Sequence, residues 1–171
     1  MIQNKKSMLF ALSFGIFSAW TTADESAEKE AVESLNFLVG TWHTESTWPE
    51  NGEQAPGTLT YEWVLGGTWL KITFIGEHPT RPVWEAHGMI RYLPQKKRYE
   101  AIIFAGPDEP INLKGTILEN GALRFEMEND GILSGIDYRP MGDGVYQENW
   151  TQEPGGSRVV RLKTTYSPIS P

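Results

Sequence analysis

The stretch LNFLVGTWHTESTW, residues 35–48, decides the fold, because the character of the chain changes within it. Up to this point DESAEKEAVESLNFL, residues 24–38, is rich in Ala, Glu and Lys, and its apolar residues recur at spacings of three and four. That spacing predicts one short amphipathic helix. After Gly40 the apolar period becomes two, which is typical of strands. The chain therefore combines a short N-terminal helix with a β domain.

Alternating apolar and polar residues are clearest in GTLTYEWVL (57–65), TWLKITFI (68–75) and GALRFEMEN (121–129). Each run has the pattern of a half-buried antiparallel strand. Turn residues separate the runs at short intervals, and Asn120-Gly121 is the strongest two-residue hairpin signal. The count predicts about ten strands, near residues 38–48, 57–65, 68–76, 83–93, 98–105, 111–119, 122–129, 132–139, 144–152 and 157–166.

The short links between these strands predict how they pair. Successive strands joined by short links are antiparallel neighbours, and about ten of them close most simply into an up-and-down barrel, which leaves no exposed edge. A two-sheet sandwich is the alternative, but it needs longer crossing connections, for which only residues 51–57 and 77–82 have room. The predicted fold is all-β: an antiparallel up-and-down β-barrel of about ten strands with a short N-terminal helix.

The first 23 residues have the features of a secretory signal peptide. Lys5 and Lys6 precede an apolar run over residues 8–17, and Thr21-Thr22-Ala23 offers small residues to a signal peptidase. The apolar run is shorter than the ~20 residues that a membrane-spanning helix needs, so a retained anchor is the less favoured alternative. We expect residues 1–23 to be removed on export to the periplasm or the extracellular space, leaving residues 24–171 as one β-barrel domain.

Charge and cysteine content exclude several classes of protein. Removing residues 1–23 takes away two lysines and no acidic residue, so the net charge of −7 becomes −9 in the mature domain. An acidic domain without Lys and Arg clusters is unsuited to nucleic acid and to anionic membranes. The chain has no cysteine, which excludes disulfides, thiol catalysis and Cys-ligated metals. We therefore expect no nucleic-acid partner and no stable membrane insertion after the signal is removed; the oligomeric state stays open.

Gly40-Thr41-Trp42 resembles the Gly-x-Trp signature of the lipocalin-like, or calycin, barrels. The segments FLVGTW (37–42) and VLGGTWLKITF (64–74) look most like a bacterial lipocalin-like family of uncharacterised function. The resemblance implies that Gly40 and Trp42 are structural residues that close one end of the barrel. It also implies that an arginine of the last strand, Arg158 or Arg161, packs across the Trp42 ring as a cation–π pair.

The chain is also distantly similar to the nitrobindin-like haem-binding barrels, which begin with a Gly-Thr-Trp. That family continues with alternating glycines, where this sequence has HTES at residues 43–46. It also takes its proximal haem ligand from a late histidine, whereas the last histidine here is His87. We therefore expect no cofactor, and haem held by another ligand, with Tyr138 or His87 as candidates, stays an alternative.

No pattern of catalytic or metal-binding residues stands out. Glu85 and His87 share a predicted strand face, but alternation predicts that this face is the solvated one. His43 is expected to point outward, and His78 lies in a proline-containing loop. Ser134-Gly135 is not part of a nucleophile elbow and has no histidine after it in the chain. We expect no catalytic residue and no metal site.

The aromatic content is the strongest pointer to function. A barrel of about ten strands is wider than the eight-stranded barrels that already enclose a small ligand, so its interior needs large side chains, a ligand or both. Aromatic side chains either fill it or line an apolar pocket with Tyr61, Tyr138 and Asn149 as polar anchors. The predicted pocket residues are Tyr61, Trp63, Phe74, Trp84, Phe104, Phe125, Tyr138 and Trp150.

The favoured interpretation is an exported binding protein for a small, largely apolar ligand, although fold alone is a poor guide to function. Two alternatives stay open: a haem-binding or enzymatic barrel that uses the same cavity, and a structural or interaction module whose barrel is filled with side chains.

Overall fold

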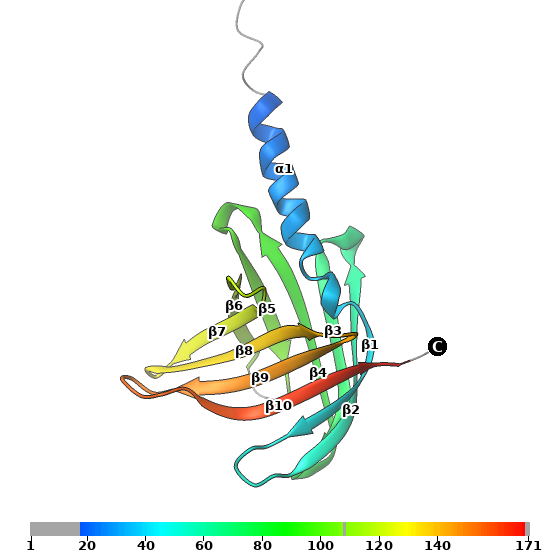
Figure 1. Cartoon of the computed structure of the whole chain (residues 1–171), viewed down its shortest axis with the longest axis vertical. Coiled ribbons are helices and arrows are strands. Elements are labelled where there is room, and N and C mark those ends of the chain that lie inside the picture. Colours follow the sequence, from blue (N-terminus) through cyan, green and yellow to red (C-terminus); the bar gives the residue numbers. More distant parts are fainter. Residues whose placement is uncertain (1–17, 108, 170–171) are drawn as a thin grey trace, which may run out of the picture.

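The computed structural model describes residues 18–107 and 109–169, which form one helix, three short 3-10 turns and ten strands (Figure 1). The strands begin and end within a few residues of the predicted ones. In chain order the elements are α1 (Ser18–Glu33), η1 (Asn36–Leu38), β1 (Gly40–Thr47), β2 (Gln54–Val64), η2 (Leu65–Gly67), β3 (Trp69–His78), β4 (Arg81–Leu93), η3 (Pro94–Lys96), β5 (Arg98–Phe104), β6 (Ile111–Ile117), β7 (Leu123–Asn129), β8 (Ile132–Met141), β9 (Gly144–Gln152) and β10 (Val159–Pro168).

The ten strands form a closed barrel in which each strand pairs antiparallel with the next along the chain. The barrel closes between β1 and β10, in a register that runs from Trp42 opposite Pro168 to Thr47 opposite Lys163. The up-and-down barrel is thus confirmed over the two-sheet sandwich. Closure leaves every strand paired on both sides, so no strand edge is exposed to another chain.

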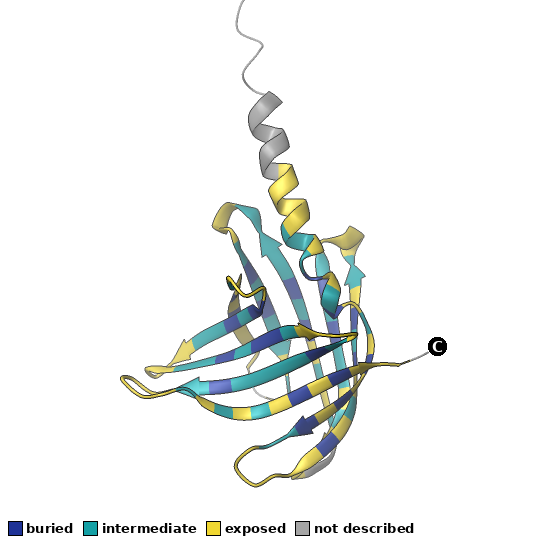
Figure 2. Cartoon of the chain, viewed as in Figure 1, coloured by how far each residue is buried: buried dark blue, intermediate teal, exposed yellow. Residues whose placement is uncertain are grey.

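The helical segment differs from the prediction in where it ends. α1 stops at Glu33, and the chain then turns through η1 before β1. Residues 25–30 of α1 are exposed, whereas Leu35 and Leu38 are fully buried (Figure 2). The reason is that the charged half of the helix has little apolar surface to bury, while the two leucines reach the end of the barrel only if the chain leaves the helical path.

Leu35 and Leu38 close one end of the barrel, which we call the closed end. They pack with inward side chains from the parts of the strands nearest to them, among them Leu70, Ile90 and Leu123. Burying each leucine stabilises the fold by about 1.5–3 kcal/mol. The closed end is therefore a packed core, and any cavity must lie toward the other end.

Most of the predicted signal peptide, residues 1–17, lies outside the described residues. Within the described part of the chain, no helix combines the length and the apolar character needed to cross a membrane.

Candidate functional site

The barrel contains a cavity of about 370 Å³. Its lining includes Trp48 just after β1, Glu77 near the end of β3, and Ile111 at the start of β6. In an up-and-down barrel these positions all lie at the end of the barrel opposite the start of β1, so the cavity opens away from Leu35 and Leu38. We call this the open end, and its rim the mouth of the cavity.

One side of the cavity is an apolar wall. It is built from the inward side chains of β2 to β8, which alternate with outward side chains along each strand. Small residues leave space there: Ala86 faces Phe74 across β3 and β4. The apolar wall consists of Leu59, Ile72, Phe74, Ala86, Ile103, Leu113, Met127 and Ile136.

The opposite side is a polar wall carried by β1, β9 and β10, which are neighbours in the barrel. Ser46 Oγ and Thr164 Oγ1 are hydrogen-bonded across the β1–β10 pair at 3.0 Å. Gln147 Nε2 donates to Asn149 Oδ1 at 2.5 Å. The polar wall consists of Thr44, Ser46, Gln147, Asn149, Thr151, Arg161 and Thr164.

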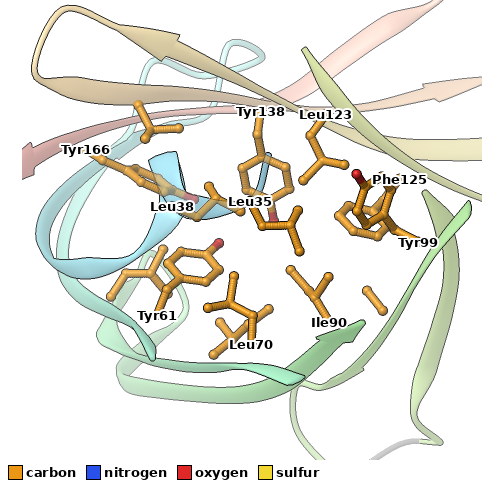
Figure 3. Packing of buried hydrophobic residues seen from close by; sticks show 14 of the residues in the cluster. Leu35, Leu38, Tyr61, Leu70, Ile90, Tyr99, Leu123, Phe125, Tyr138 and Tyr166 are labelled. Atoms are coloured by element: carbon orange, nitrogen blue, oxygen red, sulfur yellow. The ribbon is translucent and has the colours of Figure 1, made fainter. Parts of the chain in front are cut away.

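Three tyrosines form the floor of the cavity. Tyr61 from β2, Tyr138 from β8 and Tyr166 from β10 are all buried, and their hydroxyl groups point toward one another beside Leu35 and Leu38 (Figure 3). Burial raises the pKa of Tyr61 well above its ordinary value, and the neighbouring phenols raise it further. Burial also raises the pKa of Tyr138 to about 12 and that of Tyr166 well above the ordinary value. The floor is therefore neutral and offers hydrogen bonds without charge.

The mouth is partly framed by aromatic rings in edge contact. The His78 ring lies 5.4 Å from Trp48 and 5.1 Å from Trp84, measured between centroids, and Phe74 contacts Trp84 at 6.2 Å. The indole Nε1 of Trp84 is buried and has no hydrogen-bond partner among the described residues. An apolar ligand entering the cavity would pass along this aromatic edge.

Five of the eight predicted pocket residues border the cavity: Tyr61, Phe74, Trp84 and Tyr138, together with Trp150, whose ring lies on the outer face. Of the predicted polar anchors, Tyr61 and Tyr138 lie in the floor and Asn149 in the polar wall. These placements give the cavity its aromatic and polar features, whereas the other predicted residues lie elsewhere.

Trp63 and Phe125 face inward but belong to the packed core. Trp63 Nε1 donates to Asn36 Oδ1 at 3.0 Å, which ties it to η1 at the closed end. Phe125 is 1% exposed and contacts Tyr138 edge to face. The Phe125 ring fills the barrel beneath the cavity, and the half-buried Trp63 ring packs against this core at the closed end, so part of the interior is occupied by side chains.

Phe104 faces outward and does not line the cavity; it is 48% exposed. It pairs with His87, which is also exposed, whereas the inward side chains of β5 are Tyr99, Ala101 and Ile103. Residues 102–104 are all apolar, so this stretch of sequence has no alternation that could set its register.

Trp150 borders the cavity, but its ring lies on the outer face of the sheet and not on the predicted inner face. It pairs with Gly135, and an added Cβ on Gly135 would come within 2.3 Å of Trp150 Cζ2. The indole therefore lies flat across the glycine. Its Nε1 donates to Asp137 Oδ1 at 3.1 Å, and Arg158 lies on the ring.

Asp137 is the centre of an ionic cluster on the same outer face, and sequence reasoning missed it. Its side chain is fully buried and accepts two hydrogen bonds from Arg124, both at 2.7 Å, and one from Arg158 at 3.1 Å. Burial alone would raise the pKa of Asp137, but the hydrogen bonds from Arg124 and Trp150 outweigh it and hold the pKa below its ordinary value. The cluster links β7, β8 and β9 to the residue just before β10 on the outer face of the barrel.

The lipocalin resemblance implies an arginine packed across the Trp42 ring, but Trp42 makes other contacts. Trp42 is buried at the closed end, and its Nε1 donates a hydrogen bond to the Leu38 carbonyl at 2.7 Å. The centroid of its ring lies 6.3 Å from that of the Tyr166 ring. Gly40, at φ 139°, places the chain under the Trp42 ring. Arg158 stacks on Trp150 in place of Trp42, and Arg161 lines the cavity.

In the described part of the chain none of the three histidines lines the main cavity, although His78 lies at its mouth beside Trp48 and Trp84. His87 Nε2 contacts Glu85 Oε1 at 2.8 Å on the exposed outer face, as alternation predicted. Among the residues that the structure describes, no three His, Asp or Glu side chains gather in a way that could hold a metal ion.

No family model and no curated protein matches this chain. Among solved structures, the chain is similar to the S-type phycobiliprotein lyase CPES from Guillardia theta, with a TM-score of 0.56 and 10% identity over 86% of this chain and 98% of that one. A redesigned beta barrel is similar with a TM-score of 0.41 and 11% identity, over 80% of this chain and 96% of that one. The similarity to the lyase shows a shared fold, the antiparallel ten-stranded β-barrel.

Proposed function

We propose that this protein is an exported binding protein that holds a small, largely apolar ligand in the cavity of its barrel. The observation that carries the proposal is the division of the cavity into an apolar wall, a polar wall and a neutral phenolic floor. Ligand sites in proteins are mostly apolar concavities with a few placed polar groups, and their volumes begin near 300 Å³. A cavity of about 370 Å³ lies at the small end of that range.

The volume limits the size of the ligand. At roughly 30 Å³ per non-hydrogen atom, the share of liquid volume that one water molecule takes, the cavity holds about a dozen such atoms. That is the size of a medium-chain lipid or a compact ring system. A larger ligand would extend past the mouth.

Two features of the sequence support the binding role and the export of the protein. The resemblance to the bacterial lipocalin-like family, carried by residues 37–42 and 64–74, favours a binding role. The signal-like features of residues 1–23 favour export. Mass spectrometry of the protein from its own host tests export, which predicts a mature chain that begins at Asp24.

Native mass spectrometry with an absorption spectrum, on mature protein purified under mild conditions, tests the ligand. A bound small molecule supports the proposal and reveals its class. A Soret band in the absorption spectrum would indicate a haem-binding barrel and would contradict the proposal. Turnover of the bound molecule would indicate an enzyme, as the name of the structurally similar lyase does for that protein. His87, one of the two candidate haem ligands, lies on the exposed outer face, so a haem in the cavity would have to be held by Tyr138 in the floor.

Two tryptophan variants distinguish binding inside the cavity from binding on the outer surface. Ile136→Trp places a large ring on the apolar wall, whereas Ile75→Trp places it on the outer face, where Ile75 is 52% exposed. The neutral fluorescent probe N-phenyl-1-naphthylamine should bind to the wild type and to Ile75→Trp, and binding should be lost in Ile136→Trp. A wild type that binds neither this probe nor any medium-chain lipid would leave a structural or interaction module.

A further inference from the structure

Arg161 is placed at the mouth of the cavity by an irregularity in β10, and its side chain is exposed there. The register between β9 and β10 shifts between Val160, which pairs with Trp150, and Leu162, which pairs with Asn149. A β-bulge inserts one extra residue into a strand and can re-aim its side chain. Here the extra residue is Arg161, and it joins Leu162 in the cavity lining, near the mouth.

Arg161 differs from the other arginines in having no acidic partner. Five arginines, Arg91, Arg98, Arg124, Arg139 and Arg158, each form an ion pair with a carboxylate. Among the arginine side chains that the structure describes, only Arg161 pairs with none. Its Nε donates to Thr151 Oγ1 at 3.0 Å, which orients the guanidinium and leaves its two terminal nitrogens available.

Apart from one glutamate, the other described residues of the cavity lining are uncharged. Glu77 is the other charged residue among the described lining residues, and it is exposed at the end of β3, three strands from β10 around the barrel. The floor consists of uncharged phenols, and burying an unpaired charge against them would be costly. An anionic group on a ligand is therefore stabilised at the mouth beside Arg161 and disfavoured in the depth.

We propose that the ligand is an amphipathic carboxylate whose apolar body lies against the apolar wall and whose carboxylate binds Arg161 at the mouth. This inference rests on the proposed binding function. Guanidinium groups bind carboxylates in bidentate fashion through two parallel N–H donors. Thr151 and Asn149 on the polar wall stand next to the bound group.

The test compares dodecanoate with dodecan-1-ol, which share a chain and differ in charge. Both displace N-phenyl-1-naphthylamine from the wild type, and dodecanoate should bind about fivefold more tightly, the upper range for a partly exposed ion pair. Arg161→Gln should remove that preference while the affinity for dodecan-1-ol stays unchanged. Arg161→Lys should retain part of the preference. Glu77→Gln, the control at the same mouth, should keep it or increase it.

The outcomes separate the two proposals. If both lipids bind but Arg161→Gln leaves their affinity ratio unchanged, or if the wild type prefers dodecan-1-ol, the carboxylate site is wrong and the binding function stands. If the folded wild type binds neither lipid nor the fluorescent probe, both proposals are wrong.

Discussion

Arg158 lies across the indole of Trp150, with its Cζ 3.6 Å from the ring centroid, on the outer face of the barrel. The other face of the indole rests on Gly135, so the ring is enclosed and only 2% exposed although it is outside the barrel. Cation–π contacts of this kind contribute about 0.5–2 kcal/mol depending on exposure. Tryptophan is usually a core residue, but Trp150 packs on the outer face of the barrel and holds neighbouring strands together there.

Gly135→Ala should destabilise the protein, because the new Cβ would lie 2.3 Å from Trp150 Cζ2 and 2.9 Å from the backbone oxygen of Phe125. Overpacking of this kind costs about 1–3 kcal/mol of the free energy of unfolding, measurable by urea denaturation. Gly156→Ala is the control, because its Cβ would approach no atom closer than 3.3 Å. Equal stabilities for the two variants would contradict the packing of the indole on Gly135.

Asp137→Asn should cost about 3 kcal/mol near neutral pH, because it leaves Arg124 and Arg158 facing a neutral side chain in a buried cluster. The pKa of Asp137 is lowered in the folded state, so its contribution to stability is present above the unfolded pKa of about 3.9 and is lost as the pH falls through the folded value. The stability gap between wild type and Asp137→Asn should therefore close in acid. Urea denaturation at a series of pH values measures it, and a gap that does not depend on pH would show that the charge of Asp137 is unimportant.

Tyrosine ionisation should be delayed in the folded protein. Tyr138 has its pKa raised to about 12, and Tyr61 and Tyr166 are raised as well, whereas unfolded tyrosines ionise near about 10. The folded state keeps these protons where the unfolded state loses them, so this stability is present below about pH 10 and falls as the pH rises further. Tyrosinate absorbance should appear late in the native protein and near pH ~10 in urea. In Tyr138→Phe the loss of stability with rising pH should be shallower; an unchanged slope would contradict the burial of this phenol.

Trp42→Phe should weaken the closed end without affecting the cavity. It removes the hydrogen bond from Nε1 to the Leu38 carbonyl and part of the ring that packs at that end. We expect a loss of about 1–3 kcal/mol, from an unsatisfied buried carbonyl and the lost contacts. Binding of N-phenyl-1-naphthylamine should be unchanged. Trp69→Phe, at a half-buried ring that carries Arg91 4.7 Å from its centroid, is the matched control and should cost less.

The fold was predictable because turn residues and period-two alternation act locally. Asn120-Gly121 and the short links set antiparallel neighbours, and the barrel follows from them. The predicted helix over residues 24–38 extends past the observed end of α1 at Glu33, because the apolar spacing of Leu35 and Leu38 continues the helical period although both residues pack against the barrel end.

The site was predictable only in part, since it depends on contacts between distant strands. Tyr61 and Tyr138 follow from alternation, but Tyr166 joins them only because β10 closes on β1. The outward position of the Trp150 ring depends on the glycine opposite it, and the position of Arg161 at the mouth depends on a bulge. Alternation within β9 or β10 alone predicts neither position.

The closed end also determines how the molecule could be held. α1 leaves the barrel beside Leu35 and Leu38, and β10 finishes opposite Trp42 at the same end, so both described ends of the chain depart from one pole. A surface, tag or neighbouring domain attached through either end would therefore leave the mouth facing outward. Since Leu35 and Leu38 block the attached pole, a ligand of the proposed kind would enter and leave by the mouth alone, and residues at the mouth would control the rate of both steps.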